Sequence, residues 1–175
     1  MIYRRVSQFF HAISAQVTRE DRAFLEQWLP EEPARTLFAA MTTADQCHAL
    51  RTARTAEKLC SVSSKKAVDQ RLLIRAALLH DVGRQKGDMG TMGKVLTVLL
   101  AAGFPHWSEK QSETSADDWL TTLLHVHYHH PRIGAEKLRR IGLSAEADLI
   151  AQHHAPEAED DPPELVFLRQ ADQQN

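Results

Sequence analysis

Residues 76–83 read Ala76-Ala77-Leu78-Leu79-His80-Asp81-Val82-Gly83, an apolar run that ends in adjacent histidine and aspartate. A run rich in leucine and alanine predicts a buried helix, and the glycine that follows marks its end. A neutral imidazole and a carboxylate are both ligands that divalent metal ions take from proteins. The stretch therefore predicts a buried helix, over residues 67–80, that ends at two candidate metal ligands.

Helical spacing of apolar residues continues in both directions from this run. Thr18 and Asp21 have the spacing of a capping box, with aspartate in place of the usual glutamate or glutamine. Pro131 can open a helix and Gly142 can close it. Strand signals are weak, because no segment alternates cleanly between apolar and polar residues. The sequence predicts an all-α protein with helices over residues 6–17, 18–29, 33–41, 43–60, 67–80, 92–102, 117–125, 131–141, 144–153 and 164–173.

The helices are expected to form one domain over residues 43–175, preceded by an N-terminal helical extension over residues 1–42. The polar segment 108–115 is expected to be exposed. The apolar run at 95–100 fits a lid, a dimer surface or plain core, and core is favoured because apolar helical stripes usually are buried.

Composition excludes several classes of partner. The chain has 175 residues, 43% hydrophobic and 25% charged, with a net charge of −2. Neither nucleic acid nor an anionic membrane is an expected partner, so an anionic substrate must be held by local charge. No stretch approaches the roughly 20 apolar residues that span a bilayer. Cys47 and Cys60 form no CxxC motif, and the N-terminus lacks a signal-peptide core, which together favour a cytoplasmic location.

The candidate metal ligands are spread along the chain. His48 lies 32 residues before His80, and Asp172 lies near the C-terminus. With Asp81, these side chains can hold one octahedral ion and leave positions open, while His130 and His153 can complete a second ion bridged by Asp81. His125, His127 and His129 crowd beside His130, and only some of the four can reach one metal. The alternative is a helix C-terminus that carries imidazoles without a metal.

These segments together resemble the HD-domain superfamily, a group of metal-dependent phosphohydrolases with a helical core. The resemblance covers residues 42 to 175. Five segments carry it: Asp45-Gln46-Cys47-His48-Ala49-Leu50; Ala76-Ala77-Leu78-Leu79-His80-Asp81-Val82-Gly83; His130-Pro131-Arg132-Ile133-Gly134-Ala135-Glu136; Ile150-Ala151-Gln152-His153-His154; and Leu168-Arg169-Gln170-Ala171-Asp172.

The resemblance implies a role for each matched residue. The four ligands of the superfamily would be His48, His80, Asp81 and Asp172, and the additional pair of its dinuclear members would be His130 and His153. His154 would bind metal, support a neighbouring ligand or contact the substrate. Arg84 stands where relatives often carry a lysine that approaches the substrate phosphate, and it keeps the positive charge; the alternative is an ordinary surface cation. The implied cofactor is one or two divalent ions, and Fe, Mn, Co, Ni, Zn and Mg all remain open.

The implied activity is hydrolysis of a phosphate ester in a nucleotide or similar small metabolite, by a metal-activated hydroxide. Ala155-Pro156 follows the His153-His154 pair, so the Gly-Tyr-Pro signature of cyclic-di-GMP hydrolases is absent. Arg84-Gln85 likewise replaces the Glu-Asp pair of guanosine tetraphosphate hydrolases. Two alternatives remain, a dinuclear iron oxygenase on the same fold and a non-catalytic nucleotide-sensing module. The sequence leaves the oligomeric state open.

Overall fold

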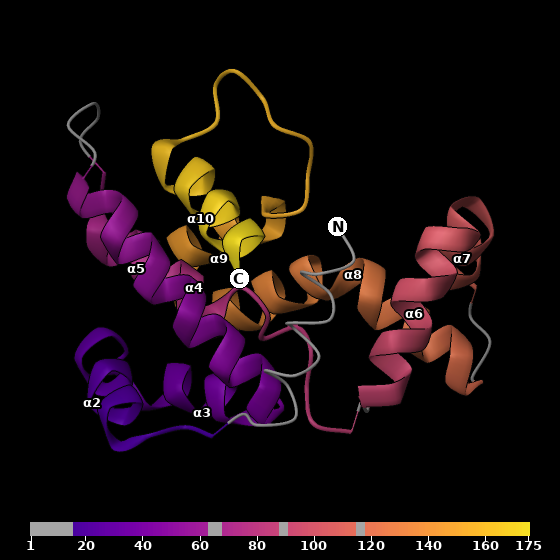
Figure 1. Cartoon of the computed structure of the whole chain (residues 1–175), viewed down its shortest axis with the longest axis horizontal. Coiled ribbons are helices and arrows are strands. Elements are labelled where there is room, and N and C mark those ends of the chain that lie inside the picture. The colour runs from indigo at the N-terminus through magenta and orange to yellow at the C-terminus, as the bar shows by residue number, and fades with distance from the viewer. Residues whose placement is uncertain (1–15, 63–67, 88–90, 115–117) are drawn as a thin grey trace.

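The computed structural model describes residues 16–62, 68–87, 91–114 and 118–175. These residues form helices without strands, which confirms the predicted all-α fold (Figure 1). Most of the helix expected over residues 6–17 lies outside the described residues. The helices are α2 (Arg19–Trp28), α3 (Glu32–Ala40), α4 (Thr43–Val62), α5 (Gln70–Leu79), α6 (Thr91–Gly103), α7 (Pro105–Ser112), α8 (Trp119–Arg140), α9 (Ser144–Gln152) and α10 (Pro163–Gln174).

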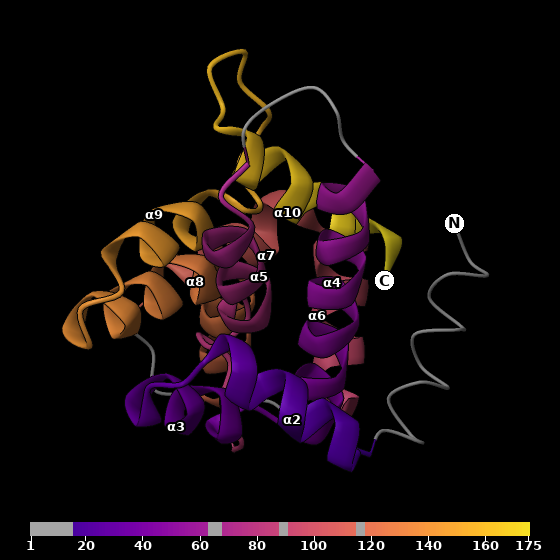
Figure 2. The same ribbon diagram turned by 90° about the vertical axis from the view of Figure 1, so that its left-hand side faces the viewer.

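Helix α5 forms the centre of the fold. Every residue from Leu73 to Leu79 is buried, and α4, α9 and α10 pack against the helix. Helices α2 and α3 cross one end of the α4–α5 pair (Figure 2). Leu29 and Phe38, from the predicted N-terminal extension, belong to the same buried cluster as Leu78. The described part of residues 1–42 thus shares the core, and a domain boundary at residue 42 stays a prediction.

One charged residue lies inside this apolar helix. Arg75 is buried, and its Nε donates to the Glu146 carboxylate of α9 at 2.6 Å. Its Nη1 donates to the Glu31 carboxylate, at the start of α3, at 2.8 Å. Charge-assisted hydrogen bonds of this kind fix geometry as well as charge. Arg75 therefore ties α5 to α9, whose ends carry His80 and His153 respectively.

The ends of several helices follow the expected local signals. Thr18 and Asp21 form the predicted capping box at the start of α2. At the end of α8, Gly142 adopts a φ of +82°, and the Leu143 N–H donates to the Leu138 carbonyl at 3.0 Å. This is a Schellman motif, and it confirms Gly142 as the residue that closes the helix.

The predicted helix break at Pro131 is wrong. Helix α8 runs without interruption from Trp119 to Arg140, with Pro131 inside it. A proline within a helix removes the N–H that would bond the carbonyl four residues earlier, here that of His127. The His130 Nδ1 takes that place, because it bonds the His127 carbonyl at 2.8 Å. A side chain thus satisfies the carbonyl that the proline leaves free.

Helices α6, α7 and the first half of α8 form a separate lobe (Figure 1). The described residues of the polar segment 108–115 are mostly exposed, as expected, although part of the segment lies in helix α7. Ser108 is a clear departure, because it is buried with its Oγ 2.7 Å from the Tyr128 hydroxyl of α8. One expectation fails here. The apolar run at 95–100 is not core, since Leu99 is 61% exposed whereas Thr97 is buried. Val95 is exposed as well, and the remaining apolar residues of the run, Leu96, Val98 and Leu100, are only half-buried.

The turn after α5 touches α8 at a glycine. A Cβ placed on Gly83 would lie 2.0 Å from the His130 carbonyl oxygen. A Cβ on Gly134 would lie 3.1 Å from the Gly83 nitrogen. The Lys137 Nζ donates to the Val82 carbonyl at 3.1 Å and holds the same turn. Backbone contact at this point brings the His80-Asp81 pair next to His130.

In the part of the chain that the structure describes, no helix has the length and apolar content needed to cross a membrane.

Candidate metal centre

Six of the predicted ligands meet in one place, although five helices contribute them. Two stand at helix ends, one in the turn after α5, and three within helices. They are His48 in α4, His80 after α5, Asp81 in the following turn, His130 in α8, His153 after α9 and Asp172 in α10.

The first group of ligand atoms comes from α4, α10 and the end of α5. The His48 Nε2 lies 2.8 Å from the Asp172 Oδ1, and the His80 Nε2 lies 3.5 Å from the same oxygen. Two atoms that each bind one ion at about 2.1 Å are at most about 4.2 Å apart. These separations therefore suit three ligands of a single ion.

Asp81 connects this group to the remaining histidines. Its Oδ2 lies 3.7 Å from the His80 Nε2, and its Oδ1 lies 3.4 Å from the His130 Nε2. Ligand atoms of Asp81, His80 and His153 also lie within 4.8 Å of one another. One carboxylate thus presents an oxygen to each group, as a bridging ligand does.

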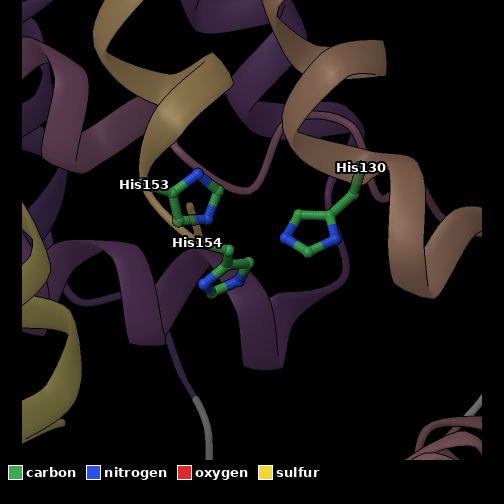
Figure 3. Close-up of side chains that lie close together, drawn as sticks. All are labelled: His130, His153 and His154. Atoms are coloured by element: carbon green, nitrogen blue, oxygen red, sulfur yellow. The ribbon is translucent and has the colours of Figure 1, made fainter. Parts of the chain in front are cut away.

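The second group consists of imidazoles. Ligand atoms of His130, His153 and His154 lie within 4.8 Å of one another, and their rings face a common space (Figure 3). The His153 and His154 ring centroids are 4.0 Å apart, and those of His130 and His154 are 5.0 Å apart. His154 is exposed whereas the other two are buried. His154 therefore stands at the solvent side of the group.

A model of the HD domain matches residues 46–173 of the chain. The chain belongs to the HD-domain family. The match spans every ligand from His48 to Asp172 and leaves out α2 and α3. Searches of the curated proteins and of the solved structures gave no significant match.

Three imidazoles of this HD domain are oriented by the same hydrogen bond. The Nδ1 atoms of His80, His130 and His153 bond the carbonyl three residues earlier in the chain, at 2.9, 2.8 and 2.6 Å. A carbonyl oxygen only accepts, so each Nδ1 carries the proton and each Nε2 is directed to the centre. Metal-binding histidines are commonly held in this way.

Two buried atoms of the HD domain are suited to bind a cation. The Asp81 Oδ1 and the His153 Nε2 are buried and have no hydrogen-bond partner among the described residues. Buried polar atoms without a partner are rare in folded proteins, because leaving them so is costly. Both are acceptors of the kind that Fe, Mn, Co, Ni and Zn bind. The donor set therefore fits a divalent ion.

Burial and neighbouring charges shift the pKa values of the residues in the centre in opposite directions. Burial disfavours the charged form of His80, but the carboxylates of Asp81 and Asp172 raise its pKa to about 9. Burial together with the neighbouring histidines His80 and His154 lowers the pKa of His153 to about 3. Burial opposes the ionisation of Asp81, yet the cations beside it, Arg84 first, hold its pKa well below the usual range. Two carboxylates and several neutral imidazoles thus face one another.

Arg84 lies at the edge of the centre. Its Nη1 donates to the Asp81 Oδ2 at 2.8 Å. Its Nη2 lies 3.1 Å from the Nε2 and 3.4 Å from the Nδ1 of His130, which places the guanidinium over the face of that ring. The side chain is 21% exposed and reaches the solvent side of the centre.

The other clustered histidines do not join the ligand group. The His125 Nδ1 bonds the Ser112 carbonyl of α7 at 3.0 Å, and the His125 and His129 rings lie 4.6 Å apart. The His127 ring stands edge-on to Tyr128, and burial followed by the charge of Arg84 lowers its pKa to about 4. Of the four histidines at 125–130, only His130 belongs to a ligand group.

Sequence reasoning missed the residues that hold the ligands. Gly83 and Lys137 act through contacts with the backbone, and Pro131 acts through the N–H that it lacks. Each of these residue types has many ordinary roles, so none of them marks a metal centre. The one signal in the sequence is Pro131 directly after a candidate ligand, and by itself that position favours a helix start.

Replacing Pro131 by alanine should weaken metal binding while it strengthens the helix. The new N–H at position 131 would bond the His127 carbonyl and displace the His130 Nδ1, which then loses the bond that orients its ring. Loss of such a bond typically weakens metal binding by 10- to 100-fold, so we expect a loss of about tenfold in a Mn²⁺ titration. Removing the proline should raise the thermal unfolding temperature. Unchanged metal affinity would contradict the orienting role.

Metal binding should release a proton and should tighten as the pH rises. In the metal-free protein His80 keeps its proton up to about pH 9, and an ion must displace it. Below that pH the apparent dissociation constant should rise by about tenfold for each pH unit lost, and above it the value should level off. Calorimetry at pH 7.5 in two buffers of different ionisation enthalpy counts the released protons. A count of zero would contradict the state assigned to His80.

Proposed function

We propose that this HD domain is a metal-dependent phosphohydrolase that cleaves a phosphate ester of a nucleotide or a similar small metabolite. The observation that carries the proposal is the convergence of His48, His80, Asp81 and Asp172, with a guanidinium at their edge. A divalent ion held by these residues supplies Lewis acidity toward a phosphoryl group and lowers the pKa of a water molecule.

The charges of the centre favour an anionic substrate. Asp81 and Asp172 balance the two charges of one divalent ion, and Arg84 then leaves the centre with a net positive charge. A guanidinium can bind phosphate through two parallel hydrogen bonds. The exposed part of Arg84 is therefore the proposed phosphate contact, and His154, at the solvent side, is the proposed second contact. The expected partner is a small molecule, not nucleic acid or membrane.

The test begins with metal analysis of the protein as purified. The metal-loaded protein is then assayed on p-nitrophenyl phosphate, bis-p-nitrophenyl phosphate, and nucleoside mono- and cyclic phosphates, each with and without oxygen. We expect turnover of at least one ester, independent of oxygen, that the Asp81→Asn variant lacks.

The other outcomes separate the rival functions. Turnover that stops without oxygen would support an iron oxygenase instead. A loaded protein that turns over none of these esters, yet binds a nucleotide, would support a sensing module. Either result would overturn the proposed hydrolase.

A further inference from the structure

Arg84 is a permanent cation beside the carboxylate that would bridge two ions. Its Nη1 contacts the Asp81 Oδ2 at 2.8 Å, and the Asp81 side chain is only 3% exposed. An arginine remains charged at any pH at which the protein is folded. The bridging position is thus neutralised in part before any metal binds.

The same guanidinium lies close to any ion on His130. An ion bound to the His130 Nε2 would lie about 2.1 Å from that atom. The Arg84 Nη2 lies 3.1 Å from the same Nε2. The ion and the Nη2 atom can therefore be no more than about 5 Å apart. The guanidinium lies over the ring face and not in its plane, so it leaves the Nε2 lone pair accessible, and its effect on an ion there is electrostatic.

The ligands near this position supply little negative charge. His130, His153 and His154 form one group of imidazoles, and an imidazole that binds a metal is neutral. Asp81 is the carboxylate that reaches this group, and Arg84 already pairs with it. The other group has Asp172, which contacts His48 and His80. The ligands near Asp172 therefore balance more of the positive charge of a bound ion than the ligands near His130 do.

We propose that Arg84 serves as the second cation of this centre, so that the domain binds one divalent ion tightly, with His48, His80, Asp81 and Asp172, and a second ion at His130 and His153 only weakly. This inference rests on the metal site of the proposed function. Its physical basis is repulsion between like charges in a partly buried place, where screening by water is weak.

The test is a count of bound ions that needs no substrate. Chelator-treated protein is dialysed against a series of free Mn²⁺ concentrations, and bound metal is measured by mass spectrometry. The parent should bind one ion per chain over at least about a hundredfold range of free Mn²⁺ before a second binds. Arg84→Gln, which removes the charge but keeps a hydrogen-bonding side chain, should bind the second ion at least about tenfold more tightly. Two Mn²⁺ ions about 3.5–4 Å apart should then give a spin-coupled electron paramagnetic resonance signal that the parent lacks.

Two control variants separate charge from shape. Arg84→Lys keeps the charge and should still bind one ion. Arg139→Gln removes an exposed arginine paired with Asp148, and its ion count should match that of the parent. Circular dichroism confirms the fold of each variant, and if Arg84→Gln does not fold, Arg84→Met, also uncharged and of similar length, carries the test.

The inference is overturned if the parent binds two ions equally tightly, if the uncharged variant still binds one, or if Arg84→Lys behaves like the uncharged variant. A parent that binds two ions and hydrolyses phosphate esters overturns the role of Arg84 alone. A parent that binds no ion overturns the proposed function as well.

Discussion

The Asp81→Asn variant is expected to lose tight metal binding and turnover together. Asp81 is buried and presents one oxygen toward His80 and the other toward His130. An amide of the same shape has one oxygen and no charge, so it cannot balance an ion or join the two ligand groups. Removing a residue that merely supports a ligand weakens metal binding by 10- to 100-fold. We therefore expect a loss of at least about a hundredfold in Mn²⁺ affinity.

The matched control is Asp148→Asn, at an exposed carboxylate that pairs with Arg139 on the surface. Its metal affinity and its turnover should both equal those of the parent. The Asp81→Asn variant is measured by equilibrium dialysis and on the most active ester of the panel. If it hydrolyses that ester as fast as the parent, Asp81 does not hold the ion that the reaction needs.

The Gly83→Ala variant is expected to be strongly destabilised. The added Cβ would stand 2.0 Å from the His130 carbonyl oxygen, and the backbone fixes the position of both atoms, so no rotamer change can separate them. The turn after α5 and helix α8 would have to separate. Overpacking in a well-packed interior typically costs 1–3 kcal/mol, and a backbone clash belongs at or above the upper end. We expect the free energy of unfolding to fall by about 3 kcal/mol or more.

Urea unfolding measures this loss, and Gly103→Ala is the control. A Cβ on Gly103, at the end of α6, meets no atom within 4 Å, so that change should be neutral or slightly stabilising. Any folded Gly83→Ala protein should also bind metal more weakly, because His130 would be displaced from Asp81. Equal stability of the two alanine variants would show that the contact at Gly83 is not tight.

Local sequence was sufficient for most helices and for their ends. Apolar spacing and a capping box at Thr18 predicted α2, and Gly142 predicted the end of α8. The exceptions have a common cause. Pro131 stays inside α8 because a histidine side chain satisfies the carbonyl that the proline leaves free. Ser108 is buried because a partner helix offers it the Tyr128 hydroxyl. In both cases a contact that propensity does not describe outweighs the local preference.

Individual ligand types could also be named in advance, but not their arrangement. His48 and Asp172 are separated by 124 positions, yet their side chains lie 2.8 Å apart. The sequence around either residue gives no indication that the two side chains meet. The crowded segment at 125–130 shows the same limit, since four histidines are chemically alike and only His130 belongs to a ligand group. His130 is the histidine that the orientation of α8 places next to the ligands at the ends of α5 and α9.

The linear order of residues was therefore enough to specify an all-helical chain, a buried helix that ends in a histidine and an aspartate, and the chemistry of the ligands available. Two features were decided only by the packed molecule: the meeting of five helices at one point, and the placing of the Arg84 guanidinium over the ring of His130. The physical reason is the distance along the chain over which each kind of interaction acts. Helix signals act over a few residues along the backbone, whereas a metal centre depends on side chains brought within a few ångströms by burial of distant apolar surfaces.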